Sequence, residues 1–254
     1  MTTVNDILSF LDTLAPGDLA ESWDNTGFAL GSRDAEVTTI LVALDPFEGV
    51  AREAAEVGAD LLVTHHPLLF SPAKSLTADS SIGRTVLTLA ANHIAAWSGH
   101  TTLDIAEGGV NDELAQILGL RDVTVIGSEN LLRCGTVDAQ STEAFLSTIK
   151  EKLGTPVLRY ADGGKPVHRV AVGGGACASE MADAIAAGCD TFVTADVKYN
   201  QFWDARDCGL TIIDAGHFYT ENPVTTVLAE KLRAAFPEVR VILSKTHADC
   251  MKFF

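Results

Sequence analysis

Long apolar runs are missing from this sequence of 254 residues. No stretch approaches the roughly 18–20 uncharged residues that a membrane-spanning helix needs. The first residues, Met1 to Asp6, also lack the basic and apolar regions of a secretory signal peptide. We therefore expect a cytoplasmic protein that has no membrane partner.

Paired thiols and basic charge are scarce as well. The five cysteines are scattered and none forms a Cys-x-x-Cys pair, which argues against a zinc site built from thiolates. Lysine and arginine together number 18 against 34 aspartate and glutamate residues, so the formal net charge is −16. A field of this sign repels phosphate backbones, and general binding to nucleic acid is not expected.

Strand-like and helix-like segments alternate along the chain. Apolar, β-branched segments at residues 37–44, 60–64 and 94–98 are separated by stretches with helical spacing. The second half repeats this order, with strands expected at residues 170–172 and 190–194. The alternation predicts an α/β fold with mainly parallel sheets that are covered by helices on both faces.

Two segments of the first half recur, in the same order, in the second half. Residues 58–64 (GADLLVT) match residues 188–194 (GCDTFVT), and Ser98-Gly99-His100 with Asp104 matches Ala215-Gly216-His217 with Glu221. We therefore expect an internal duplication into two related α/β halves, residues 1–125 and residues 126–254. The first half carries the His-His-Pro and His-x3-Asp motifs, and the second carries a glycine-rich turn and the His-x3-Glu motif.

Five side chains that can ligate metals come soon after predicted strands. They are His65, His66, Asp104, His217 and Glu221. Ligands of open α/β sheets bind beyond the carboxyl ends of the strands, so we expect these side chains to converge in the cleft between the halves. Imidazole together with carboxylate suits zinc, iron or manganese. The sequence therefore predicts a centre of two divalent metal ions whose identity it leaves open.

The adjacent histidines need a special backbone to serve one centre. Within a regular strand the rings of His65 and His66 would point to opposite faces. At a strand end that turns into Pro67 both rings can face one cavity. A His-His pair alone is equally compatible with structural or surface histidines, and the two matching His-x3-carboxylate motifs favour the metal site.

Four motifs carry these residues and their neighbours. They are residues 23–27 (WDNTG), residues 64–70 (THHPLLF), residues 100–104 (HTTLD), and Gly216-His217 followed by Glu221. In order and spacing they resemble the signatures of the Nif-three-like dinuclear metal-centre family, whose bacterial members are often named GTP cyclohydrolase type-two homologues. The resemblance implies two α/β domains and a homohexamer whose metal pairs face an internal cavity. Longer members have an inserted middle domain, which this chain lacks.

The resemblance also implies a role for each residue. His65 and Asp104 would serve one ion, His66 and His217 the other, and Glu221 would bridge them. His100 would transfer protons or support the ligands. Thr102 stands where the family commonly has asparagine, and Asn200 where it often has histidine. The second departure leaves the role of residues 196–200 open.

The site chemistry indicates hydrolysis, because two divalent ions can bind a bridging water and lower its pKa. We expect a metal-dependent hydrolase, similar to GTP cyclohydrolase type-two homologues, whose small-molecule substrate is a nucleotide, a heterocyclic amide or a phosphoester. The alternative is a non-enzymatic metal-binding assembly that stores or delivers metal or docks a regulatory partner.

Three other features are expected to serve the fold. Gly173 to Gly175 could cradle a phosphate with backbone amides, although a tight turn explains the glycines more simply. Trp23-Asp24-Asn25 is expected to form a structural corner. His93, His168 and His247 have no partner at ligand spacing, so we expect surface or core histidines.

Overall fold

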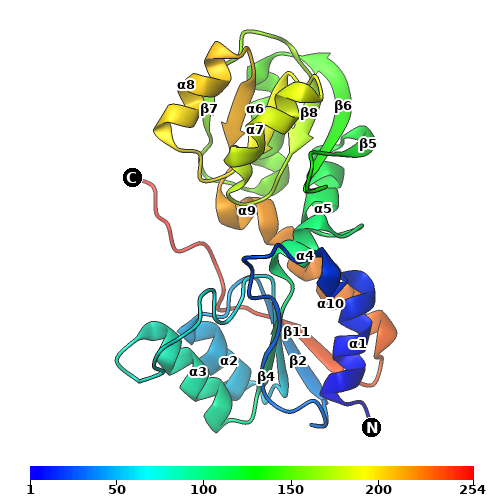
Figure 1. Ribbon diagram of the computed structural model, residues 1–254, viewed down its shortest axis with the longest axis vertical. Coiled ribbons are helices and arrows are strands. Elements are labelled where there is room, and N and C mark those ends of the chain that lie inside the picture. Colours follow the sequence, from blue (N-terminus) through cyan, green and yellow to red (C-terminus); the bar gives the residue numbers. More distant parts are fainter. The chain divides into compact units, whose positions relative to one another are not determined.

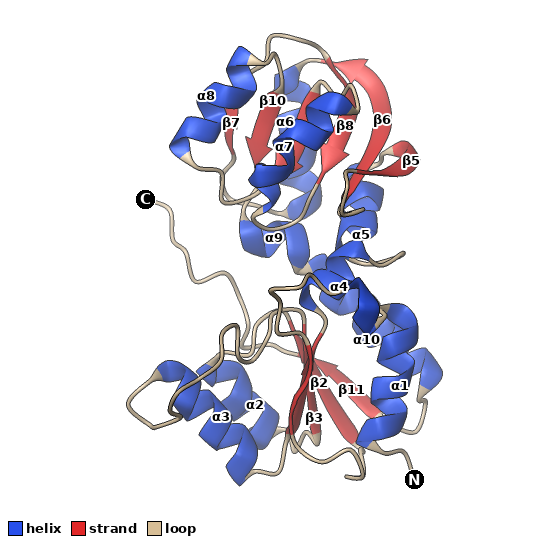
Figure 2. Ribbon diagram, viewed as in Figure 1, coloured by secondary structure: helices blue, strands red, loops and turns tan.

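Residues 1–254 are described by a computed structural model, and they form two units with one β-sheet each. The first unit contains Met1–Ala106 and Val224–Asp249, and the second contains Glu107–Pro223 and Cys250–Phe254. Figure 1 follows the chain through both units, and Figure 2 separates their helices and strands. The helices are all too short or too polar to traverse a lipid bilayer.

The first unit is a five-stranded sheet in the order β1-β4-β3-β2-β11. Its strands are β1 (Gly27–Leu30), β2 (Thr39–Ala43), β3 (Leu61–Thr64), β4 (Ala95–Ser98) and β11 (Arg240–Leu243). Its helices are α1 (Val4–Leu14), the 3-10 turn η1 (Gly17–Leu19), α2 (Glu48–Glu56), α3 (Ser81–Ala91), α4 (His100–Ile105) and α10 (Pro223–Ala235). Helices α2 and α3 cover one face of the sheet, while α1 and α10 cover the other (Figure 2). All pairings except the antiparallel β1–β4 pair are parallel.

The second unit is a six-stranded sheet in the order β5-β6-β8-β9-β10-β7. Its strands are β5 (Arg121–Ile126), β6 (Leu132–Gln140), β7 (Arg159–Ala161), β8 (Val167–Val172), β9 (Thr191–Thr194) and β10 (Thr211–Asp214). Its helices are α5 (Val110–Leu118), α6 (Thr142–Leu153), the 3-10 turn η2 (Cys177–Glu180), α7 (Met181–Ala186), α8 (Tyr199–Asp207) and α9 (His217–Glu221). Strands β8, β9 and β10 pair in parallel, and the outer strands are antiparallel.

Helices cover both faces of this second sheet. Successive side chains of a strand point to opposite faces, so neighbouring residues of β8 pack against different helices. Val170 and Val172 belong to a buried cluster that includes Phe145 of α6. Ala171 belongs to another cluster that includes Ala184 of α7. The expected α/β class with mostly parallel central strands is therefore confirmed, and the antiparallel edges are added by β1, β5, β6 and β7.

The two units repeat one order of elements, helix-strand-strand-helix-strand-helix-strand-helix, from α1 to α4 and from α6 to α9. Asp60, before β3, accepts hydrogen bonds from the backbone N–H groups of Thr38 and Thr39, at 2.7 and 3.0 Å. Asp190, before β9, accepts hydrogen bonds from the N–H groups of His168 and Arg169, at 3.0 and 2.7 Å. In each unit, an aspartate that precedes one strand thus binds the backbone N–H groups at the start of the neighbouring strand, which supports the internal duplication.

The expected contiguous halves, residues 1–125 and 126–254, differ from the two units of the structure. Leu114 and Leu118 of α5 pack with Phe145 in the second unit, although they follow the first repeat in sequence. Strand β11 pairs in parallel with β2 of the first unit, with Arg240 opposite Thr39. Helix α5 follows the first repeat and belongs to the second unit, while α10 and β11 follow the second repeat and belong to the first unit. Comparison of the two halves of the sequence could not reveal this exchange.

Candidate metal centre

His65 and His66 stand where β3 ends, and both rings lie on the same side of the chain. Their ring centroids are 4.7 Å apart. The backbone N–H of His66 still donates to Leu44 O at 2.9 Å, and Pro67 then turns the chain away. His65 is fully buried and His66 is partly exposed. The strand end thus relaxes the alternation of side chains, as the sequence predicted.

His100 and Asp104 approach these histidines from α4. Strand β4 pairs in parallel with β3, so their carboxyl ends meet at one edge of the sheet. Nε2 of His65 lies 3.6 Å from Oδ1 of Asp104. The ring of His100 lies 5.5 Å from that of His65 and 5.6 Å from that of His66, between centroids. The first unit therefore brings together four of the six candidate residues.

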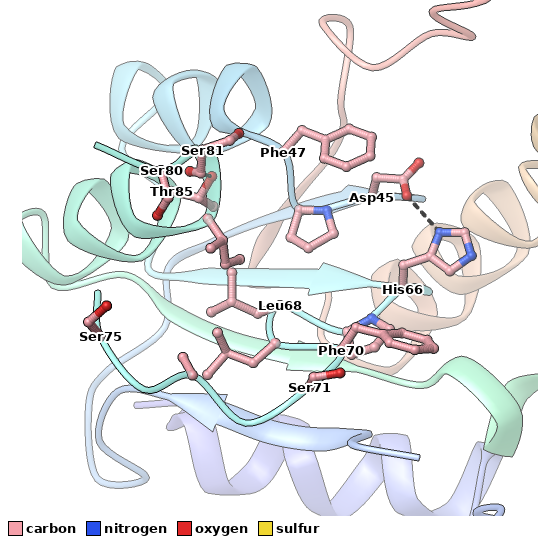
Figure 3. A pocket seen from close by; sticks show the side chains of 15 residues that line it. Asp45, Phe47, His66, Leu68, Phe70, Ser71, Ser75, Ser80, Ser81 and Thr85 are labelled. Carbon is pink, nitrogen blue, oxygen red and sulfur yellow. Dashed lines mark hydrogen bonds and ion pairs between the residues drawn. The ribbon is translucent and has the colours of Figure 1, made fainter. Parts of the chain in front are cut away.

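Asp45 fixes the ring of His66. The carboxylate follows β2, and its Oδ1 lies 2.7 Å from His66 Nδ1 (Figure 3). The other oxygen, Oδ2, lies 2.6 Å from Nε2 of His247. Burial alone would raise the pKa of Asp45, but the contacts with His247 and His66 outweigh it and hold the pKa well below its usual range. Asp45 therefore remains a carboxylate that orients the ring through Nδ1, which makes Nε2 the atom that would coordinate a metal.

Asp24 holds His100 in a similar way. Its Oδ1 lies 2.8 Å from His100 Nδ1, and its Oδ2 accepts hydrogen bonds from the hydroxyl and N–H of Thr101, at 2.6 and 3.2 Å. Burial alone would raise the pKa of Asp24, but the contacts with Thr101 and His100 hold it below its ordinary value. His100 has φ of 25°, a backbone conformation that is unfavourable outside glycine and is concentrated at functional sites.

His217 and Glu221 lie in the second unit, one turn apart on α9. Nε2 of His217 lies 2.9 Å from Oε2 of Glu221, whose side chain is buried. Nδ1 of His217 lies 2.8 Å from Oδ2 of Asp196, which follows β9 and has φ of 51°. The segment 196–200 therefore contacts the candidate ligand His217 through Asp196.

The glycine-rich turn does not offer free amides to a phosphate. The N–H of Gly173 donates to Val193 O at 3.0 Å. The N–H groups of Gly174 and Gly175 donate to Asn111 Oδ1 and Thr220 Oγ1, at 2.7 and 3.0 Å. The phosphate-cradle interpretation is therefore wrong, and the tight-turn interpretation holds.

Gly175 has a further reason to be glycine. It has φ of +63°, and a Cβ built there would lie 2.0 Å from Oε1 of Glu221 and 3.3 Å from Cε1 of His217. The backbone of the turn therefore packs directly against the candidate ligands, and a side chain at this position would displace Glu221.

These donors fit a divalent metal of intermediate hardness. His65, His66 and Glu221 each offer one ligand atom, and the set contains imidazoles and carboxylates without a thiolate. Metal-binding histidines usually donate their other ring N–H to a carboxylate or carbonyl, which fixes the tautomer. Asp45 provides that contact for His66, and Asp196 provides it for His217.

Four residues that hold the candidate histidines in place, directly or through Asp45, were not selected from the motifs: Asp24, Asp45, Asp196 and His247. Asp45 and Asp196 each lie two residues beyond a strand end, so the rule that selected His66 would also have found them. Asp24 was assigned to a structural corner, and it also holds His100. His247 was expected to be a surface or core histidine, and its side chain, 6% exposed, contacts Asp45. No local pattern around His247 indicates that contact.

Comparison with known proteins identifies the family. The profile of the family described as Duf34/NIF3 (NGG1p interacting factor 3) matches residues 2–250. A Clostridium perfringens protein named "GTP cyclohydrolase 1 type 2 homolog" is 36% identical over 259 residues, covering 98% of this chain and 99% of the relative. The crystal structure of Staphylococcus aureus protein SA1388 is similar at 26% identity and TM-score 0.90, covering 100% of this chain and 99% of that one.

A Bacillus cereus protein related to NIF3 shares the fold, with TM-score 0.94 at 22% identity, covering 100% of this chain and 99% of that chain. The family match covers nearly the whole sequence and includes every candidate ligand. This chain belongs to the Duf34/NIF3 family.

Proposed function

We propose that His65, His66, Asp104, His217 and Glu221 hold two divalent ions, and that the protein is a metal-dependent hydrolase. The observation that carries the proposal is the pair of contacts Asp45–His66 and Asp196–His217, at 2.7 and 2.8 Å, which is the arrangement of metal-ligating histidines. The resemblance supports the division of ligands, with His65 and Asp104 on one ion, His66 and His217 on the other, and Glu221 between them. Zinc, iron and manganese all suit these donors.

Divalent ions at these positions would lower the pKa of a water molecule and so supply a nucleophile at neutral pH. The residues of the chain would provide the proton transfer. His100 has its Nδ1 engaged by Asp24, so its Nε2 would carry the proton to or from the substrate. The side chain of His100 is 13% exposed, so part of its ring is accessible from solvent.

The substrate is a nucleotide, a heterocyclic amide or a phosphoester, and the name of the Clostridium perfringens relative supports hydrolysis of a purine ring. The second candidate is a non-enzymatic metal-binding assembly that stores or delivers metal or docks a partner protein. The family description favours it, because it names an interacting factor. The resemblance also supports a homohexamer, which sedimentation would test. We also propose a cytoplasmic location, which cell fractionation would test.

The test is reconstitution of metal-free protein with zinc, manganese or iron, followed by counting of bound metal and a screen of GTP, other nucleotides, phosphoesters and cyclic amides. We expect two equivalents of metal and turnover that disappears in Glu221→Gln. The variant His100→Gln should keep both metals and lose turnover. Two bound metals without turnover of any substrate would favour the assembly, and fewer than two would overturn the metal assignment.

A further inference from the structure

A cavity of about 730 Å³ lies beside His66 and is formed by residues of the first unit alone. Three segments build it: residues 45–47 after β2, residues 66–75 after β3, and the start of α3 with its N-cap Ser80. Its size is in the range of pockets that bind small molecules and cofactors. In Figure 3, Asp45 and His66 are drawn at one end, and Ser80, Ser81 and Thr85 at the other.

Exposed apolar side chains line the cavity. Phe47 is 59% exposed, Phe70 is 61% exposed and Ile82 is 38% exposed. Large apolar side chains that gather in the open commonly mark a binding site, because leaving them in water costs free energy. Phe47 stacks on His247, with centroids 6.3 Å apart and planes at 25°. One phenyl ring is thus braced by a side chain that also contacts Asp45.

Phe70 is braced as well. Its ring lies 6.0 Å from that of Trp23 and 5.8 Å from that of His100, between centroids. Phe47 and Phe70 therefore offer aromatic surface close to His66, each held by neighbouring rings. Planar rings stack favourably on such surfaces.

The charge of the lining limits which ligand it can take. No lysine or arginine lines the cavity, and Asp45 is its one carboxylate. The nearby Arg84 donates from Nε to Glu48, at 2.8 Å, and from a terminal nitrogen to Ala78 O, at 2.9 Å. Away from His66 and any metal held there, a phosphate inside the cavity would meet no lysine or arginine, so a di- or triphosphate is disfavoured there.

We propose that this cavity binds a neutral, planar heterocyclic ring between Phe47 and Phe70, with a polar ring edge directed at His66. The hydroxyl groups at the start of α3 would contact a substituent at the far end. The inference rests on the proposed function, and it selects the heterocyclic amide from the three substrate classes named above. A nucleotide would bind through its base alone, with its phosphates outside the cavity.

Guanosine and GTP are a matched pair of probes, since they share one neutral ring and differ by a triphosphate. Binding to the full-length, metal-free protein would be measured by ligand-observed NMR, with quinolin-2-one as a second neutral ring amide. We expect guanosine to bind at least as tightly as GTP. Phe47→Ala and Ile82→Ala should each weaken guanosine about 5- to 20-fold. Leu87→Ala is the control, because Leu87 is an exposed apolar residue of α3 outside the cavity.

The outcomes separate this inference from the proposed function, because ring binding is measured without metal or turnover. Tighter binding of GTP than of guanosine would overturn the ring-binding inference. Guanosine binding that is unchanged in both Phe47→Ala and Ile82→Ala would also overturn it. If Phe47→Ala instead changed the oligomeric state in light scattering and no ring bound, the apolar surface would be a contact between copies of the chain. Thermal melts of each variant would show that the fold is retained.

Discussion

Asp45 and His66 are joined by a 2.7 Å contact between Oδ1 and Nδ1, which ties a candidate metal ligand to the strand next to its own. Asp45 follows β2 and His66 follows β3, so the parallel pairing of these strands sets the distance between the two side chains. The second unit offers a similar contact, 2.8 Å long, between Asp196 and His217. In both places an aspartate beyond a strand end orients a histidine.

Replacing Asp45 by asparagine should therefore weaken metal binding. The carboxylate of Asp45 makes the His66 ring a stronger metal ligand, and the neutral amide of asparagine would not. Mutating a carboxylate that orients a metal-binding histidine typically lowers metal affinity about 10- to 100-fold. Titration of zinc against a chromophoric chelator would measure the change. Asp34→Asn is the control, because Asp34 is an exposed aspartate of the same unit. Equal zinc affinity in Asp45→Asn and the parent protein would contradict the orienting role of Asp45.

Gly175→Ala should disturb the candidate ligand Glu221. Alanine at φ of +63° costs about 1–2 kcal/mol, and its Cβ would lie 2.0 Å from Glu221 Oε1, so the carboxylate must move. We expect lower metal affinity in the same titration. Gly154→Ala is a matched control, because Gly154 has φ of +68° and nothing within 4 Å of an added Cβ. Gly154→Ala should lose about as much stability as Gly175→Ala and keep its metal affinity. An equal loss of metal affinity in both variants would refute the contact between Gly175 and Glu221.

Much of the fold could be predicted because its signals are local. The apolar strand of residues 60–64 ends at two histidines, and comparison of residues 58–64 with 188–194 revealed the duplication. The pairing of β11 with β2 could not be predicted this way, because short apolar strands carry no record of their partner.

The site divides in the same manner. Five metal-capable residues could be selected because each follows a strand and because Asp104, His217 and Glu221 belong to repeated motifs. The contact of Asp45 with His247 joins residues 202 apart in sequence, and it forms only because the chain beyond β11 returns past the end of β2. No periodicity encodes that return.

Glu53 predicts a pH-dependent contribution to stability. This buried carboxylate on α2 accepts hydrogen bonds from the hydroxyl of Ser244, at 2.5 Å, and from the N–H groups of Lys245 and Thr246, at 2.8 and 3.2 Å. Burial alone would raise the pKa of Glu53, but these donors outweigh it and lower the pKa. The stabilisation is therefore complete above the unfolded-state pKa of about 4.3 and is lost as pH falls through the lower folded-state value.

Glu53→Gln should accordingly lower the free energy of unfolding by about 1–3 kcal/mol at pH 7, and the difference should shrink below about pH 4.3. Urea unfolding at a series of pH values would measure it. Glu56→Gln on the same helix is the control, since Glu56 is exposed and should show little effect at any pH. A difference that stays constant down to acidic pH would mean that the charge of Glu53 does not contribute.

Asp60 and Asp190 should stabilise their own units in the same way. Asp60 Oδ2 accepts from the N–H groups that open β2, and Asp190 accepts from those that open β8. Alanine at either position leaves these donors without their carboxylate, which should cost about 1–3 kcal/mol. Hydrogen exchange followed by mass spectrometry would locate the loss.

The duplication makes this a paired test, because each variant serves as the control for the other. Asp60→Ala should speed amide exchange in β2 and β3 and leave β8 and β9 protected, while Asp190→Ala should do the reverse. Such a result would mean that each repeat keeps its own brace and opens as its own cooperative unit. Faster exchange across both sheets in either single variant would instead mean that the two repeats unfold together, so that both aspartates stabilise one cooperative structure.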